Sequence, residues 1–267
     1  PYNHSVPAFS ILKTPVYSFG HRNAQGIVWG NVNGTWRLYS SEHGDKSDDE
    51  VNNILPATNY GWPKVAGMGT DNNYSSLDAF ANNDRLASSL VNYAENTWAT
   101  TNTMQRPLFA TFNWAASAIP ADGSNIFTWP TIAPSSIDIY QGNIPGWKNS
   151  LLVTSLKYGM YRLKLKSSGD YVDSASSTNI VDTFPLLHSW RVGDIAINPS
   201  PNSGTFWVVM DSTGSTSGPT GGFTGGNSPT KDGGKILRLR YNTLLTLPLN
   251  ENPRSGPPIV KDLIQVY

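Results

Sequence analysis

The sequence predicts an all-β protein made of propeller-like strand units, and three observations lead to that prediction. The apolar runs are short, rich in β-branched and aromatic residues, and bounded by Gly, Pro and Asn. Their apolar residues alternate at close to period two, as in strands with one buried face. A strand–turn–strand pattern also recurs along the chain, which is typical of propeller blades. A β-sandwich is the structural alternative.

The expected elements follow in chain order. Eight strands are predicted, at 26–32, 35–41, 136–142, 150–156, 159–165, 194–200, 205–211 and 235–241. The best helical pattern lies at 76–93 and fits a short insertion better than a core element. Residues 1–242 are expected to form the propeller part, within which the Gly-, Ser- and Thr-rich stretch 211–234 predicts a mobile surface loop. Residues 243–267 are rich in proline and predict a tail.

The repeated pattern has three copies. Residues 22–39 and 191–209 each contain an Arg, a small apolar strand, an Asn/Gly/Thr turn and an aromatic strand, and 135–156 is a looser copy. A unit of this kind buries its apolar faces only by stacking on its neighbours, so the repeat predicts stacked blades rather than isolated hairpins.

Composition excludes several classes of partner. The 267 residues are 14% charged with a formal net charge of zero, so nothing favours nucleic acid or an anionic membrane. There is no run of 18 apolar residues that predicts a membrane span, and there are no cysteines. Three sequons, at Asn3, Asn33 and Asn73, are compatible with a secreted protein. Nine Trp and twelve Tyr leave a generic carbohydrate-binding β-domain open as a further interpretation.

An acidic stretch, EHGDKSDDE at 42–50, is the clearest candidate for chemistry. Acidic runs are usually solvated faces, and that is the ordinary interpretation here. The alternative is a loop that holds a metal, because carboxylate and carbonyl oxygens are the ligands that Ca²⁺ prefers. The aromatic turn NYGWP follows closely at 59–63.

Several stretches resemble the soluble pyrroloquinoline-quinone (PQQ) glucose dehydrogenases and the wider glucose/sorbosone (aldose sugar) dehydrogenase family. The similar stretches, in the family's order, are GHRNAQGIVW at 20–29, SEHGDKSDDEVNNI at 41–54, NYGWPKVAG at 59–67, WPTIAPSS at 129–136, NSLLVTSLKYGMYRLKL at 149–165, RVGDIAINP at 191–199 and DGGKILRLRYN at 232–242. The resemblance implies a six-bladed propeller of which this chain supplies about three blades. It also implies PQQ and calcium as cofactors, oxidation of an aldose at its anomeric carbon by hydride transfer, and a periplasmic or secreted location.

The resemblance assigns metal-binding roles. Gly44 and Asp45 match positions whose backbone carbonyls hold the cofactor's calcium, although the family usually has Pro at the second position. Glu50, with the carbonyls of Tyr60 and Ala66, matches a second, structural calcium site, which Asp71 would complete. The same family match favours ion binding over a solvated acidic face.

Cofactor contacts are assigned in the same way. Arg22 and Asn23 match residues directed at the quinone oxygens, where a fixed guanidinium stabilises the charge that reduction creates. The alternative is a blade-corner Arg paired with backbone carbonyls. Further cofactor-binding matches are Trp129, Thr131, Lys157 and Arg191. The last two would neutralise carboxylates of the cofactor, while Trp129 could instead fill a blade core.

Two departures from the family pattern leave a second function open. The family often has another Arg two places after the first in an R-x-R pattern, but this chain has Gly193. The family's general-base His, an orienting Asp and a Gln near the sugar precede the GHRN motif, and no histidine here matches that base: His4, His21, His43 and His188. The alternative is therefore a non-catalytic propeller relative with a structural or carbohydrate-binding role.

Three blades with open edges would expose strand amides and apolar faces. The sequence therefore predicts a partner, either the N-terminal half of the same propeller or another chain that completes the ring. The end of the tail alternates apolar residues and is the likeliest extra strand for that contact.

Overall fold

The computed structural model describes residues 2–3, 13–44, 47–70, 72, 94–111, 131–173, 181–183, 187, 191–211, 234–241 and 264–266. The chain divides into two compact units. The first comprises Pro1–Pro134 with Ser168–Val172, and the second comprises Ser135–Ser167 with Asp173–Tyr267.

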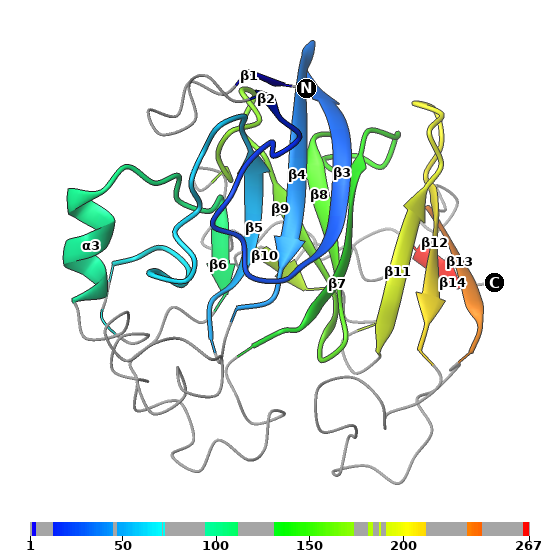
Figure 1. The fold of residues 1–267 in the computed structure, drawn as a ribbon. Helices are drawn as coiled ribbons and strands as arrows, with labels where there is room; N and C mark the ends of the chain where they lie inside the picture. Colours follow the sequence, from blue (N-terminus) through cyan, green and yellow to red (C-terminus); the bar gives the residue numbers. More distant parts are fainter. Residues whose placement is uncertain are drawn as a thin grey trace, which may run out of the picture. The chain divides into compact units, whose positions relative to one another are not determined.

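The first unit is built around a four-stranded antiparallel sheet (Figure 1). Its strands follow one another as a meander: β3 (Ala24–Val32), β4 (Thr35–Glu42), β5 (Asp49–Ile54) and β6 (Phe109–Thr111). Two short strands, β1 (Tyr2–Asn3) and β2 (Lys13–Thr14), pair with each other. The helix α3 (Glu95–Thr101) lies between β5 and β6 in the chain.

The second unit contains two more four-stranded meanders. The strands of the second sheet are β7 (Pro134–Tyr140), β8 (Ser150–Ser155), β9 (Gly159–Lys164) and β10 (Val181–Thr183). Those of the third sheet are β11 (Val192–Ile197), β12 (Thr205–Met210), β13 (Ile236–Tyr241) and β14 (Ile264–Val266). Among the described residues, these three meanders make the protein almost entirely β, with the topology of propeller blades.

Local sequence explains the tightest hairpin. Asn33 and Gly34 join β3 to β4 with φ of 49° and 93°. Two consecutive residues of positive φ make a type I′ turn, whose twist matches that of the flanking strands, and Asn-Gly is the preferred pair for it. The turn fixes the register in which Asn31 lies opposite Trp36 and Trp29 opposite Leu38.

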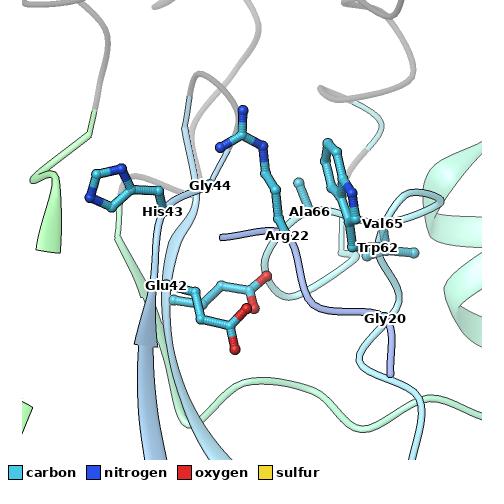
Figure 2. A pocket seen from close by; sticks show the side chains of 9 residues that line it. Gly20, Arg22, Glu42, His43, Gly44, Trp62, Val65 and Ala66 are labelled. Atoms are coloured by element: carbon cyan, nitrogen blue, oxygen red, sulfur yellow. The ribbon is translucent and has the colours of Figure 1, made fainter. Parts of the chain in front are cut away.

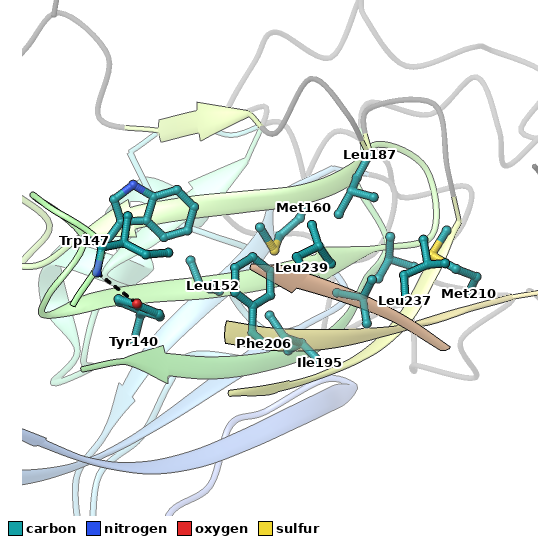
Figure 3. Close-up of a cluster of buried hydrophobic side chains, with 13 residues drawn as sticks. Tyr140, Trp147, Leu152, Met160, Leu187, Ile195, Phe206, Met210, Leu237 and Leu239 are labelled. Atoms are coloured by element: carbon teal, nitrogen blue, oxygen red, sulfur yellow. Dashed lines mark hydrogen bonds between the residues drawn. The ribbon is translucent and has the colours of Figure 1, made fainter. Parts of the chain in front are cut away.

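A hydrophobic core joins the second and third sheets (Figure 3). The second sheet and its β7–β8 connection contribute Tyr140, Trp147 and Leu152, among others, and β12 contributes Phe206 and Val208. Trp147 packs edge-on against Tyr140, with ring centroids 5.7 Å apart. The Tyr140 hydroxyl accepts a hydrogen bond from the Ile144 amide (3.1 Å), so this aromatic contact also closes the β7–β8 connection.

All eight predicted strands are confirmed, and the three repeat copies are the first two strands of the three sheets. One prediction was wrong. The acidic stretch was expected to be a loop, but β5 begins within it at Asp49, and Glu42, Asp48 and Asp49 are buried rather than solvated. The end of the tail is a strand, β14, which pairs with β13 of the third sheet, and its contact with a partner stays a prediction.

The predicted helix at 76–93 and nearly all of the predicted loop at 211–234 lie outside the described residues. No helix in the described part of the chain is long and apolar enough to cross a membrane.

Candidate functional site

The candidate site is built where β4 ends and β5 begins. Glu42, the last residue of β4, lies opposite Glu50 near the start of β5. Opposite residues of an antiparallel pair project from the same face, so the two carboxylates share one side of the first sheet. Asn52, two residues further along β5, donates its Nδ2 hydrogens to both, at 3.1 Å to Glu42 Oε1 and 2.9 Å to Glu50 Oε2.

Glu42 is tied to the segment that precedes β3. His21 Nδ1 lies 2.8 Å from Glu42 Oε1, and His21 Nε2 lies 2.8 Å from Ser18 Oγ. The imidazole also stacks on the Tyr60 ring, with centroids 4.5 Å apart. Burial opposes ionisation of Glu42, but the hydrogen bond and charge of His21, helped by Ser40 and Asn52, leave its pKa below the usual value. Glu42 is therefore a buried carboxylate that His21 keeps ionised.

The pKa of Glu50 is shifted in the opposite direction, above its usual value. Its carboxylate accepts hydrogen bonds from Asn52 Nδ2 and from the Gly67 amide, at 2.7 Å to Oε1. The residue is only half-buried by exposed area, but the carboxylate itself is enclosed by these two donors. Burial raises its pKa to about 8, and the charges of Glu42 and Asp48 add to this against the two hydrogen bonds. A cation beside Glu50 would reverse the shift.

Asp49 fixes the turn between the two strands. Its Oδ1 accepts from the Gly44 amide (2.9 Å), and its Oδ2 accepts from the amides of Ile132 (2.5 Å) and Ala133 (2.8 Å). His43 donates from Nε2 to the Pro134 carbonyl (2.8 Å) and thus points into the same junction. Asp49 is a positioning residue that holds the Gly44 turn against residues 132–133.

A small cavity of about 10 Å³ opens between these elements (Figure 2). Its walls come from the segment before β3, the end of β4, the start of β5 and the 61–67 turn, as Gly20, Arg22, Glu42, His43, Gly44, Glu50, Trp62, Val65 and Ala66. A volume of this size holds one water molecule or one ion. The Arg22 guanidinium lies over the Trp62 ring, 5.3 Å from its centroid, a cation–π geometry that fixes its direction.

The structure brings together three of the predicted metal-binding residues. Gly44, Glu50 and Ala66 all line the cavity. The Ala66 amide is anchored by Glu95 Oε1 of α3 at 2.8 Å. Tyr60 is buried beside the site, where its hydroxyl donates to the Asn53 carbonyl (2.6 Å). The predicted ligands Asp45 and Asp71 lie outside the described residues.

Side chains alone do not make a metal centre in the described part of the chain. No group of three or more His, Cys, Asp or Glu side chains is placed to hold an ion there. An ion in this cavity would therefore depend on the two carboxylates together with backbone carbonyl oxygens, which is the mixture that Ca²⁺ accepts.

The predicted cofactor-binding residues are spread over both units. In the first unit, Arg22 lines the cavity, Asn23 is exposed and accepts from Gln25 Nε2 (2.7 Å), and Thr131 is buried. Trp129 lies outside the described residues. In the second unit, Lys157 follows β8, and its amide donates to Ser155 Oγ (3.1 Å).

Arg191 is engaged within the protein. It is buried before β11, and its Nη2 and Nε lie 2.7 and 3.1 Å from Asp211 Oδ2. Gly193 sits at a β-bulge between Val192 and Asp194. A Cβ built at Gly193 would meet only the Val209 carbonyl, at an ordinary 3.6 Å, so a side chain fits there.

Glu42, Asp49, Asn52 and Glu95 belong to the site but were not singled out from the sequence. Only one of them carried a usable signal: Asn52 is two residues from Glu50 on the same strand and so shares its face. The others acquire their roles through partners that are distant in sequence, such as His21 for Glu42 and Ile132 for Asp49.

The chain is similar in sequence to known sugar dehydrogenases. Residues 7–114, which include the first sheet, match the Glucose / Sorbosone dehydrogenase family. The chain is 32% identical over 254 residues to quinoprotein glucose dehydrogenase B of Acinetobacter calcoaceticus, covering 88% of this chain and 50% of that protein. Among solved structures, PQQ-bound aldose sugar dehydrogenase from Streptomyces coelicolor matches with a TM-score of 0.47 and 22% identity, covering 88% of this chain and 48% of that one.

The apo form of the soluble aldose sugar dehydrogenase from Escherichia coli matches with a TM-score of 0.47 and 19% identity, covering 79% of this chain and 48% of that one. The chain thus spans about half the length of these proteins. By its sequence matches, the chain belongs to the glucose/sorbosone dehydrogenase family.

Proposed function

We propose that the chain is part of a quinoprotein sugar dehydrogenase that oxidises an aldose at its anomeric carbon, with PQQ and calcium as cofactors, in a periplasmic or secreted setting. The observation that carries the proposal is the 32% identity to quinoprotein glucose dehydrogenase B over 88% of this chain. The stretch that matches the family model contains Arg22, Gly44 and Glu50, which line a single cavity.

The cavity fits a cation in size and charge. The carboxylates of buried Glu42 and half-buried Glu50 face a space of about 10 Å³, and Glu50 has a raised pKa that a cation would lower. The resemblance assigns two ions, the cofactor's calcium at the carbonyls of Gly44 and Asp45 and a second calcium at Glu50 with the carbonyls of Tyr60 and Ala66. Because Gly44, Glu50 and Ala66 line one cavity, these three are the groups that would hold a calcium ion there. Glu42 is already paired with His21, so its contribution is negative charge near the ion.

For PQQ, the first unit supplies the positive charge of Arg22, whose guanidinium is held in one orientation over Trp62. PQQ, when bound, would accept the hydride from the sugar. Arg22, held over Trp62, is placed to stabilise negative charge beside the Gly44 turn (Figure 2). A guanidinium fixed before the reaction needs no reorganisation when charge develops, which is why such groups favour the charged state. Asn23, exposed next to it, would add an amide donor.

The supporting experiment is a titration of this chain with PQQ in the presence of calcium, followed by absorbance. We expect weak binding, because Gly193 removes one cationic partner and the chain spans half of its relatives' length. Arg22→Gln should lower that binding about tenfold or more, since one charge-assisted contact contributes ~1–3 kcal/mol. Arg106→Gln, at an exposed arginine away from the cavity, is the matched control.

A non-catalytic relative with a structural or carbohydrate-binding role is the second candidate. Arg191 favours it, because Asp211 already neutralises this guanidinium. Gly193→Arg separates the two candidates, since the bulge has room for a side chain and the change restores the R-x-R pattern. If the chain is part of the enzyme, this variant should bind PQQ at least about tenfold more tightly than the parent chain, because it gains one charge-assisted contact of ~1–3 kcal/mol. No PQQ binding by either protein would favour the non-catalytic candidate.

A further inference from the structure

The turn between β3 and β4 contains a residue pair that can react with itself. Asn33-Gly34 is the only Asn-Gly pair in the sequence, and both residues are exposed. Gly34 has no side chain to shield its amide nitrogen, and a Cβ built on it would meet nothing within 4 Å. These are the conditions under which an asparagine side chain can cyclise onto the amide that follows it.

The reaction converts the asparagine into an acid. The Gly34 amide nitrogen loses its proton to solvent and attacks Asn33 Cγ. A bond forms between that nitrogen and Cγ, the bond from Cγ to Nδ2 breaks, and Nδ2 leaves as ammonia. Water then opens the five-membered succinimide at either carbonyl, which gives aspartate or isoaspartate. One amide and one water thus become one carboxylic acid and one ammonia, and no oxidation or reduction takes place.

The structure engages the nitrogen that has to react. The Gly34 amide donates a hydrogen bond to Asn31 Oδ1 at 2.8 Å. This bond must break before the nitrogen can lose its proton and turn towards Asn33 Cγ. The type I′ turn, with φ of 49° at Asn33 and 93° at Gly34, also holds the two residues in one conformation. The Asn31 side chain is therefore placed to slow the cyclisation.

We propose that Asn33 is a modification site, at which asparagine converts to aspartate or isoaspartate, and that Asn31 sets the rate of this conversion. Loss of one neutral hydrogen bond should raise the rate in the folded chain about two- to tenfold. The two products have different effects. Aspartate adds a negative charge to an exposed turn, whereas isoaspartate adds a carbon to the backbone of a two-residue turn that fixes the β3–β4 register.

Two exposed indoles near the turn can report a change of register. Trp29 of β3 and Trp36 of β4 are stacked, with an interplanar angle of 13° and centroids 6.2 Å apart. Because they come from the two strands that the turn joins, their stacking depends on the register between these strands. Isoaspartate at position 33 should therefore weaken the near-ultraviolet circular dichroism of the pair, and aspartate should leave it unchanged.

The test follows the conversion in the full chain, folded and in guanidinium chloride, at mildly alkaline pH. The chain is produced in a host without N-glycosylation, because Asn33 also begins a sequon and a glycan would occupy Nδ2. Peptide maps by isotope-resolved mass spectrometry measure the conversion, and an isoaspartyl methyltransferase assay measures isoaspartate. Asn202, which is exposed and precedes Ser203, is the internal reference in the same maps.

Three substitutions separate the role of Asn31 from that of the fold. Asn31→Ala and Asn31→Val remove the acceptor, the second with a side chain that suits a strand. Asn31→Asp keeps an acceptor oxygen and is the conservative control. Far-ultraviolet circular dichroism shows which variants are folded, and should Asn31→Ala unfold, Asn31→Val decides.

We expect Asn33 to convert more slowly in the folded parent chain than in guanidinium chloride. Conversion should become about two- to tenfold faster in folded Asn31→Ala and Asn31→Val, and it should stay near the parent rate in Asn31→Asp. In guanidinium chloride all four proteins should convert equally fast, and Asn202 should not respond to the substitutions. Equal rates in the folded parent and the folded acceptor-free variants overturn the proposal. So does a folded parent that converts as fast as in guanidinium chloride, or an Asn33 that converts in none of the folded proteins.

Discussion

The first and third sheets use equivalent faces in different ways. On β12 the residues of this face are Phe206, Val208 and Met210, all buried and apolar. On β4 the equivalent face passes from exposed Trp36 to Ser40 and Glu42, which are buried and polar. In the third sheet this whole face packs into the hydrophobic core. In the first sheet one part of the face is exposed and apolar, at Trp29 and Trp36, and the other part is the hydrogen-bonded cluster of Glu42, Glu50 and Asn52. The candidate site therefore lies on the first sheet, where Ser40, Glu42 and Asn52 form a hydrogen-bonded polar cluster.

The largest expected effect is on the packed side of this comparison. Phe206→Ala should lower the free energy of unfolding by about 3–5 kcal/mol, as for other buried Phe→Ala changes, because it leaves a cavity among Tyr140, Trp147 and Leu152. Urea denaturation followed by circular dichroism measures it. Val209→Ala, on the opposite face of the same strand and 42% exposed, should cost under about 1 kcal/mol. Similar losses for the two variants would contradict the assignment of faces.

The next largest effect concerns Glu50, in the carboxylate cluster of the first sheet. Since burial raises the pKa of Glu50 from 4.5 to about 8, the folded chain keeps this proton over a pH range where the unfolded chain has lost it. Raising the pH from 5 to 8 should therefore lower the free energy of unfolding in calcium-free buffer, by an amount of the order of one to a few kcal/mol. Thermal melts across this range, with and without calcium, measure the change.

Glu50→Gln should flatten this pH dependence, because the amide carries no proton to lose. The variant should also lose any rise in melting temperature that calcium gives the parent chain at pH 8. Asp170→Asn, at a partly exposed carboxylate that faces Arg37, is the control and should keep both responses. A Glu50→Gln variant with unchanged calcium content and melting behaviour would show that no ion site exists at Glu50.

The smallest expected effect sharpens the comparison. Trp36→Ala should change the free energy of unfolding of this chain alone by no more than about 0.5 kcal/mol, because its indole is exposed and surface substitutions rarely do more. Phe206, at the equivalent position, is predicted to differ from it severalfold. If Trp36→Ala lowers the free energy of unfolding by several kcal/mol, the indole of Trp36 must be covered within this chain.

The sequence predicted the strands well because their signals are local. The Asn33-Gly34 turn and the alternation of the flanking residues specify β3 and β4 without reference to the rest of the chain. β5 was not predicted as a strand because it begins with Asp49 and Glu50. Acidic residues are expected to be solvent-exposed unless the groups that bind them are known. Those partners are distant: Asp49 binds the amides of residues 132 and 133, and Glu50 binds that of Gly67.

The site was predictable only in outline. Family resemblance singled out Arg22, Gly44, Glu50 and Ala66 for separate roles at the quinone and at two calcium ions, and the structure places all four around one cavity. The pairing of Arg191 with Asp211 was not foreseen, because a sequence does not show which acid a buried arginine will meet. The exposure of Ile27, Trp29 and Trp36 could not be predicted either, because the exposure of a sheet face depends on what covers it and not on which residues form it.

The three hydrogen bonds accepted by the Asp49 carboxylate have a consequence for the order in which the chain folds during synthesis. Two of its donors, the amides of Ile132 and Ala133, are made 83 and 84 residues after it. Until they emerge, the carboxylate has only the Gly44 amide of these three, and β5 also waits for β6 at 109–111. Contacts so far apart close slowly. A nascent chain in which Ile132 and Ala133 have not yet been made can thus form the β3–β4 hairpin but cannot finish the turn that shapes the cavity.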